Sequence, residues 1–295
     1  MCDELTEADS HDWSARAGMT RRGFAVASVA AGIAAGVTLA LPGSAHALAV
    51  AEQDVLITTP DGEADCYFVH PEKGAHAAVL VWPDILGLRP AFRVMGRRLA
   101  EAGYAVLVIN PYYRMAPSPV VSVGESFRDP ATRERIMPFA RALTAQTNVT
   151  DAKAFVSWLD AQDAVDTSRP VGTTGYCMGG PMVLRTAAAL PDRVGAGATF
   201  HGSRMVTDGA DSPHTLISEM RGSYLIAIAE NDHERQPEAR GVMESAFGGA
   251  GLTAEIEVYE DAMHGWCALD SRAHHPEQAA RAHWRLLETF RTALA

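Results

Sequence analysis

Short apolar runs alternate with longer amphipathic segments from about residue 50 to the end of the chain. Short apolar runs are typical of strands, and apolar residues that recur every three or four positions are typical of helices. We predict strands at residues 54–58, 65–69, 77–82, 104–110, 170–174, 196–200, 223–229 and 255–259. We predict helices at residues 90–102, 132–145, 150–162, 181–190, 212–220, 237–247 and 275–294. This alternation predicts a mostly parallel sheet with helices on both faces, which is the α/β class.

Individual segments refine this arrangement. The run at 77–82 is apolar throughout, so we expect that strand to be buried on both faces of the sheet. The first two predicted strands flank a Pro60-Asp61-Gly62 turn and should form an antiparallel pair at the sheet edge. Residues 111–130 contain four prolines, which exclude a regular element and predict a loop that serves as a lid or pocket wall. Because no linker interrupts the pattern, residues 48–295 are expected to form a single domain.

The first 47 residues do not continue this pattern. Arg21 and Arg22 precede an uncharged stretch, rich in Ala and Gly, that extends to Leu41. Ala45 and Ala47 then give the A-x-A end of a cleavage site, so residues 1–47 are predicted to be a twin-arginine export signal. The alternative is an uncleaved anchor helix, which the Ala and Gly content disfavours. We expect an exported protein, or a cytoplasmic one if the signal is not used.

Composition narrows the classes of partner. The chain has 295 residues, 47% of them hydrophobic, and a formal net charge of −11 without long runs of one sign. This argues against nucleic acid as a main partner. The histidines lack the spacing of a metal site, so neither a metal nor another cofactor is expected. A small molecule is the expected partner, and the oligomeric state is left open.

The segment that points most clearly to chemistry is residues 175–180, which read Gly-Tyr-Cys-Met-Gly-Gly between a predicted strand and a predicted helix. Gly175 and Gly179 lie two residues on either side of Cys177, as in the nucleophile elbow of the α/β-hydrolase fold. The following helix directs its N-terminus towards the sulfur, which favours the thiolate. Cys177 is therefore the candidate nucleophile. The alternative is a buried structural cysteine in a glycine-rich turn.

Partners for Cys177 should lie at the carboxyl ends of other strands, where ligands collect in such sheets. Asp232 follows the predicted strand 223–229, and His264 follows 255–259, which gives the order nucleophile, acid, histidine. We predict that His264 transfers the proton and that Asp232 orients it. Taken alone, Asp232 could cap a turn and His264 could be an ordinary loop histidine. His233 competes as the base, although it is adjacent to the acid in sequence.

With these residues in place, the chain resembles the dienelactone hydrolase family over roughly residues 53–293. Residues 175–180 resemble the G-x-C-x-G-G turn of that family, and residues 83–88, Pro-Asp-Ile-Leu-Gly-Leu, are similar to its loop after the third strand. The resemblance implies an oxyanion hole formed by the N–H groups of Ile85 and Met178. Asp84 replaces a Glu that helps to control the proton of the thiol, and it could instead only cap the turn. Gly265 differs from the Ser often found after the histidine.

The resemblance is weaker in the residues that would hold the substrate. Family members that act on anionic dienelactones hold the carboxylate with arginines, one of them a few residues after the catalytic histidine. Here that segment contains no arginine before Arg272, and Arg128, Arg133 and Arg135 are alternative cations or solvated helix residues. Four further residues near strand ends are predicted to line an apolar pocket, with ordinary packing as the alternative: Trp82, Tyr176, His201 and Trp266.

The predicted function is therefore hydrolysis of a carboxylic ester or lactone through a Cys-His-Asp triad and a thioester intermediate. Two other classes remain open. One is a thiol redox or sensor protein in which Cys267 resolves Cys177, while Cys66 is a further thiol in the mature chain. The other is a binding protein that has kept the hydrolase scaffold but lost turnover.

Overall fold

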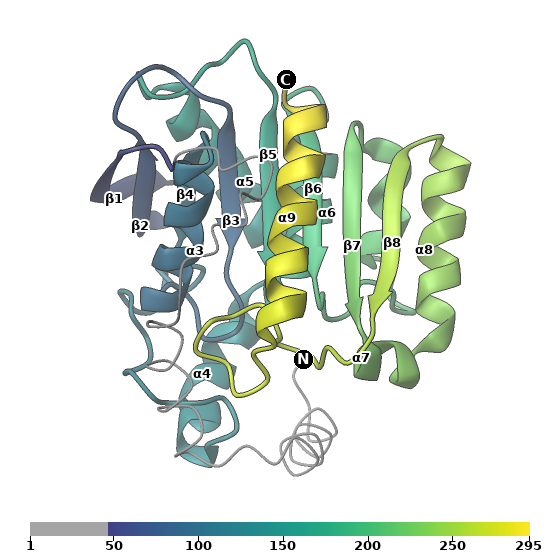
Figure 1. Cartoon of the computed structure of the whole chain (residues 1–295). Coiled ribbons are helices and arrows are strands. Elements are labelled where there is room, and N and C mark those ends of the chain that lie inside the picture. The colour runs from purple at the N-terminus through teal and green to yellow at the C-terminus, as the bar shows by residue number, and fades with distance from the viewer. Residues whose placement is uncertain (1–46) are drawn as a thin grey trace, which may run out of the picture.

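A computed structural model describes residues 47–295 of the chain. The predicted export signal at 1–47 lies outside these residues apart from its last position. The core of the fold is an eight-stranded sheet with the order β1-β2-β4-β3-β5-β6-β7-β8 (Figure 1). The strands are β1 (Val50–Thr59), β2 (Gly62–Pro71), β3 (Ala78–Trp82), β4 (Ala105–Ile109), β5 (Val171–Tyr176), β6 (Val194–Phe200), β7 (Ser223–Ala229) and β8 (Thr253–Tyr259).

The pairing of the strands agrees with the sequence pattern. β1 pairs antiparallel with β2, and β2 pairs antiparallel with β4, whereas all other neighbours are parallel. Every residue of β3, β4 and β5 is buried, because helices cover both faces of the centre of the sheet. The prediction of an α/β-hydrolase sheet is confirmed.

Helices cover the two faces in separate sets. α3 (Pro90–Glu101) and α9 (Pro276–Ala293) lie on the face that is nearer in Figure 1 and bury Phe92, Leu286 and Phe290 in one core cluster. The opposite face is covered by α5 (Ala145–Asp160), α6 (Gly180–Ala189) and α8 (Pro237–Ala250). The remaining helices are α4 (Pro130–Ala142), the short α7 (Glu230–Arg235), and the 3-10 segments η1 (Cys177–Gly179) and η2 (Pro213–Glu219).

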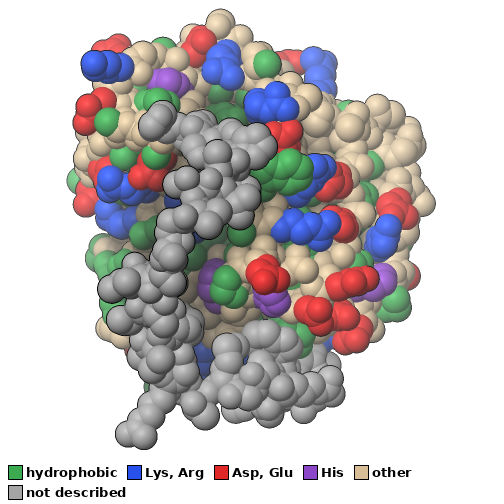
Figure 2. Space-filling view, in the orientation of Figure 1, with side chains coloured by type: hydrophobic (Ala, Val, Ile, Leu, Met, Phe, Trp, Pro, Cys, Tyr) green, Lys and Arg blue, Asp and Glu red, His purple; other side chains and the backbone are tan. Residues whose placement is uncertain are grey.

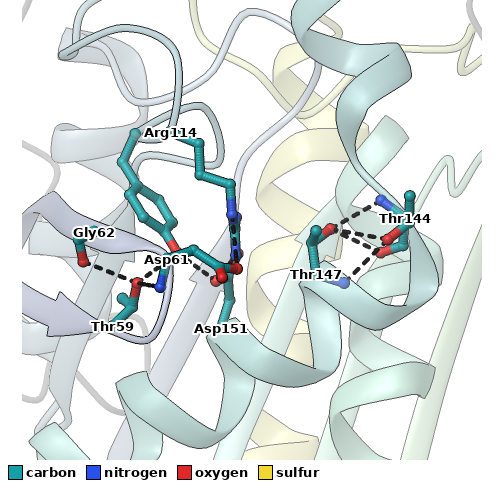
Figure 3. A network of polar contacts seen from close by, with 8 residues as sticks. Thr59, Asp61, Gly62, Arg114, Thr144, Thr147 and Asp151 are labelled. Carbon is teal, nitrogen blue, oxygen red and sulfur yellow. Dashed lines mark hydrogen bonds and ion pairs between the residues drawn. The ribbon is translucent and has the colours of Figure 1, made fainter.

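Two of the predicted helices differ from the structure in ways that have a clear local cause. α5 begins at residue 145 rather than 150, because Thr144 caps it: the Thr144 hydroxyl accepts a hydrogen bond from the N–H of Thr147, whose side chain accepts one from the N–H of Thr144 (Figure 3). The predicted helix at 212–220 is the 3-10 segment η2, which begins with Pro213. Both differences arise from local turn chemistry rather than from the hydrophobic pattern.

A buried polar network fixes the start of the proline-rich loop. Asp151 of α5 accepts two hydrogen bonds from Arg114, at 2.7 and 2.9 Å, and one from the Tyr113 hydroxyl at 2.7 Å. Arg114 also reaches Asp61 in the β1–β2 turn, and the Tyr113 hydroxyl lies 2.7 Å from that of Thr59 (Figure 3). The loop after β4 therefore extends towards the carboxyl edge of the sheet from a rigid anchor.

The visible described part of the face shown in Figure 2 has no large patch of a single charge. On the face shown in Figure 2, basic and acidic side chains are interspersed where they are visible. Within residues 47–295, no helix combines the length and the hydropathy needed to cross a bilayer.

Candidate active site

Cys177 lies immediately after β5 and opens the turn into α6. Its φ is +52°, a left-handed conformation that is strained for a residue with a side chain. A Cβ on Gly175 would lie 2.2 Å from the carbonyl oxygen of Gly179, and a Cβ on Gly179 would lie 2.2 Å from that of Trp82. The G-x-C-x-G spacing is thus a steric requirement of the turn.

Asp232 and His264 meet although 32 residues separate them. The Asp232 carboxylate, on α7 after β7, lies 2.6 Å from Nδ1 of His264, on the loop after β8. The N–H of His264 donates to the side-chain oxygen of Asn231 at 2.8 Å, which fixes the backbone of the histidine as well. His233, the competing candidate for the base, lines a different small cavity. That cavity does not include Cys177.

The charge state of His264 follows from its surroundings. Burial alone lowers the pKa of the imidazole, but Asp232 and the sulfur of Cys177 outweigh this effect and raise its pKa well above 6.5. An imidazole in this state can hold a proton next to a thiolate. The arrangement brings all three predicted triad residues to one place.

Two residues at the end of β6 complete the surroundings of the sulfur. The Ser203 hydroxyl lies 3.7 Å from Sγ of Cys177, and the Ser203 N–H donates to the Cys177 carbonyl at 3.0 Å. The His201 ring lies 4.9 Å from that of His264, and burial lowers the pKa of His201. Burial therefore favours the neutral form of the His201 imidazole. Ser203 was not identified from the sequence, although its place after a parallel strand was a signal for it.

Ile85 and Met178, the predicted oxyanion-hole residues, both lie close to Cys177. Ile85 follows β3, and both residues line a cavity that includes Cys177. The buried Tyr112 connects them: its hydroxyl donates to the Ile85 carbonyl at 2.7 Å and lies 3.4 Å from Sδ of Met178. Tyr112 is a second residue that sequence reasoning missed.

Asp84 has partners other than the thiol. Its carboxylate forms a bidentate ion pair with Arg89, at 2.6 and 2.9 Å, and accepts the N–H of Leu86 at 2.9 Å. Arg89, only 4% exposed, forms a second bidentate pair with Asp270 at 2.7 and 2.8 Å. The contact with the Leu86 N–H is that of a residue that caps a turn, which was the alternative to a role of Asp84 in controlling the thiol proton. They also link the loop after β3 to the loop that follows His264.

Two cavities meet at Cys177. The larger has a volume of about 310 Å³ and extends over α6 and the C-terminal end of α4. The smaller, of about 130 Å³, lies between the His264 loop and residues 124–128 of the proline-rich loop, which therefore forms a pocket wall. Ile85 and Cys177 line both cavities, so a substrate can extend from the thiol in two directions.

The aromatic residues predicted to line the pocket are mostly core residues. Only His201 lines one of the two cavities. Trp82 packs near Phe155, with ring centroids 6.2 Å apart, while Tyr176 stacks on Phe200 and Trp266 on Tyr259, both at 5.2 Å. The packing alternative therefore holds for Trp82, Tyr176 and Trp266, because alternate residues at a strand end point into the sheet layers rather than over its edge.

Of the arginines considered as cations for the substrate, some line a cavity and others do not. Arg128 and Arg272 line the smaller cavity. Arg135 instead pairs with Glu125 at 2.8 Å, and the Arg133 guanidinium lies over the Phe127 ring, 5.5 Å from its centroid. Arg133 and Arg135 line neither cavity.

The other thiols differ from Cys177. Cys66 and Cys267 are free and buried, and burial raises the pKa of both. A thiol that ionises with difficulty is a poor resolving group, so these positions do not favour a redox pair. In the described part of the chain, no group of three or more His, Cys, Asp or Glu residues is arranged to hold a metal ion.

Known proteins resemble this chain in sequence and in fold. The family model "Dienelactone hydrolase family" matches residues 64–294. A carboxymethylenebutenolidase of Rhodococcus opacus is 27% identical over 71% of this chain and 77% of its own length. Among solved structures, a dienelactone hydrolase-like promiscuous phosphotriesterase from metagenomic libraries has a TM-score of 0.67 at 21% identity, covering 84% of this chain and 100% of that one. The dienelactone hydrolase of Anabaena variabilis has a TM-score of 0.59 at 19% identity, covering 83% and 99%. A matched family model over most of the chain, on a sheet whose strand ends assemble Cys177, His264 and Asp232, identifies the chain as a member of the dienelactone hydrolase family.

Proposed function

We propose that this hydrolase cleaves carboxylic esters or lactones through a thioester formed on Cys177. The single observation that carries the proposal is the 2.6 Å contact between Asp232 and His264, beside a cysteine held at positive φ. The relatives named carboxymethylenebutenolidases support a small lactone or ester as the substrate class.

The proposed first step is attack of the Cys177 thiolate on the ester carbonyl. The resulting oxyanion would be held by the N–H groups of Ile85 and Met178, a type of contact whose loss typically costs about 3 kcal/mol of transition-state stabilisation. His264 would donate its proton to the leaving alkoxide as the carbon–oxygen bond breaks, leaving a thioester and a free alcohol. For a lactone, the alcohol would stay attached to the acyl group.

The second step would release the acid. Neutral His264 would take a proton from water as the water attacks the thioester carbonyl, and the thiolate would leave with the imidazolium restored. Asp232 would hold His264 in one tautomer and stabilise its cation in both steps. The positions of Ser203 and His201 beside the sulfur support a polar environment for the attacking water.

The test is hydrolysis of p-nitrophenyl acetate combined with intact-protein mass spectrometry. Wild-type protein should turn over, and a rapidly quenched sample should carry one acetyl group on Cys177. Cys177→Ala should abolish both signals, and Cys177→Ser should be only weakly active because His264 is arranged for a thiol. Activity retained by Cys177→Ala would exclude the proposed nucleophile. A Cys177–Cys267 disulfide in the purified protein would favour the redox class, and an acetyl group that never leaves would favour a binding protein.

We also propose that the protein is exported by the twin-arginine route, on the sequence of residues 1–47 alone. Residues 1–50 fused to a folded reporter should carry it out of the cytoplasm, and Arg21→Lys with Arg22→Lys should retain it there. Export that survives this double substitution would exclude the twin-arginine route.

A further inference from the structure

The larger cavity beside Cys177 carries an excess of positive charge. Three arginines line it, Arg141, Arg185 and Arg204, against one acidic residue, Asp211. None of these arginines forms an ion pair with a carboxylate anywhere in residues 47–295. The smaller cavity differs, because its carboxylates include Asp84 and Asp270, which neutralise Arg89.

Arg185 is the most confined of the three cations. Its Nε is buried without a hydrogen-bond partner, and its Nη2 reaches only the backbone carbonyl of Asp211, at 3.4 Å. Burial lowers the pKa of Arg185; the charge of Asp211 opposes this effect in part, and that of the nearby Arg204 adds to it. A buried guanidinium N–H without a hydrogen-bond partner is costly, and an anion bound at Arg185 would offset that cost. The arrangement is therefore suited to the binding of an anionic group.

The lining between the sulfur and these cations is apolar. Met178, Pro181 and Met182 line the cavity near the thiol. Arg185 follows Pro181 by four residues on α6, so it lies on the same face about 6 Å further along the helix axis. A ligand that reaches from Cys177 to Arg185 must therefore carry its charge at the far end of a short apolar chain.

We propose that Arg185 and Arg204 bind an anionic group of the substrate, separated from the scissile carbonyl by a short aliphatic chain. This inference rests on the proposed ester hydrolysis and adds the substrate class. The site lies on α6 and on the turn after β6, not on the segment after His264 where the family resemblance places a substrate-binding arginine. Arg128 and Arg272 of the smaller cavity are the competing location.

The experiment compares two esters that differ only in terminal charge: mono-p-nitrophenyl adipate and p-nitrophenyl hexanoate. Wild-type enzyme should favour the adipate ester in kcat/KM. Arg185→Gln and Arg204→Gln should each lower kcat/KM for the adipate ester by about tenfold, mainly through KM, and change the hexanoate value by less than about twofold. Arg185→Lys, which keeps the charge, should recover part of the loss. Inorganic phosphate should compete with the adipate ester in wild type and compete less well in Arg185→Gln.

Two further variants make the result specific. Arg240→Gln removes an exposed cation of α8 that is paired with Glu244, and it should leave both esters unaffected. Arg272→Gln tests the smaller cavity. Equal wild-type activity on the two esters, or a loss of adipate preference in Arg272→Gln but not in Arg185→Gln, would overturn the inference.

A binding measurement can test the anion site independently of the proposed hydrolysis. Calorimetry with Cys177→Ala and monoethyl adipate should detect binding that is lost in Cys177→Ala/Arg185→Gln. Binding of this kind without hydrolysis of either ester by wild type would refute the proposed hydrolysis and leave the anion site standing. Hydrolysis of both esters without charge-dependent binding would refute the anion site alone.

Discussion

The Tyr112 hydroxyl donates a hydrogen bond of 2.7 Å to the carbonyl oxygen of Ile85. On the other side of the same peptide group, the Leu86 N–H donates to the Asp84 carboxylate at 2.9 Å. The peptide that follows Ile85 is therefore fixed from both sides, and this restricts the direction of the Ile85 N–H. An oxyanion hole depends on donors that are oriented before the reaction begins.

Tyr112→Phe should slow the reaction without removing a group that touches the substrate. The ring would still fill its buried space, but the Ile85 carbonyl would lose its partner, and the N–H of Ile85 would be less well oriented. We expect kcat to fall about tenfold, equivalent to about 1.4 kcal/mol, with little change in KM. Tyr113→Phe is the matched control, because that hydroxyl belongs to the Asp151 network. Equal effects of the two changes on kcat would contradict this role.

Arg89→Met should destabilise the whole protein. The change leaves Asp84 and Asp270 without the buried cation that both contact, and loss of one partner from such a pair typically costs about 3–5 kcal/mol. Urea unfolding measures the difference. Arg221→Met, at an exposed pair with Asp192, should cost less than about 1 kcal/mol. If Arg89→Met lowers the free energy of unfolding no more than Arg221→Met does, the ion pairs of Arg89 with Asp84 and Asp270 do not stabilise the fold.

Asp84→Asn distinguishes support of the loop from control of the proton. The amide oxygen can still accept the Leu86 N–H, while the charge that faces Arg89 is lost. If Asp84 acts through the loop, the pH dependence of kcat/KM should keep its shape, and kcat should fall by less than about tenfold. A shifted or missing limb in the pH profile would instead assign Asp84 to the proton on Cys177.

Gly179→Ala should be far more damaging than an alanine at an open glycine. The new Cβ would meet backbone atoms of Trp82 at 2.2 Å, and neither strand nor turn can move away. Overpacking of this kind typically costs about 1–3 kcal/mol or more, and the misplaced elbow should also lose activity. Gly241→Ala, in α8 with open space around it, should stabilise the protein by up to about 1 kcal/mol. Thermal unfolding of both variants measures this contrast.

The stability of the protein should depend on pH through His264. Asp232 raises the pKa of His264 well above 6.5, so the folded state holds the proton more tightly than the unfolded state. The resulting stabilisation is fully present below pH 6.5 and is lost as pH rises through the folded pKa. The advantage of wild type over Asp232→Asn in urea unfolding should therefore shrink as pH rises above neutrality. An advantage that grows with pH would reverse the assigned direction.

The fold was predictable because its strands carry strong signals. The apolar run at 77–82 could be buried only at the centre of a sheet, and the glycines around Cys177 left little doubt about the turn. The start of α5 was predicted less well, because it depends on the side chain of Thr144 rather than on hydrophobic spacing. The pattern of buried residues thus predicted which segments are strands and helices. The exact residue at which a helix such as α5 begins depends on single hydrogen bonds.

The site was predictable only where chain order fixed it. Asp232 and His264 could be located because each directly follows a parallel strand. Arg89 and Tyr112 could not, since an arginine at a helix start and a tyrosine in a loop are common, and their partners lie far away in sequence, as with Asp270. For Trp82 and Trp266 the sequence left pocket lining and ordinary packing both open, because proximity to a strand end does not reveal which layer a side chain enters.

Two cavities meet at the sulfur of Cys177, and this bears on the order in which the two products of the proposed reaction would leave. In the proposed reaction, the alcohol would lie in one cavity and the acyl group in the other, so release of the alcohol would not require the acyl group to move. If the alcohol leaves from the smaller cavity, which His264 lines, water entering that cavity would reach the proposed thioester beside the histidine. The two cavities would thus hold the acyl and alcohol parts of the substrate apart from the start of the proposed reaction, and the alcohol would leave before the acid.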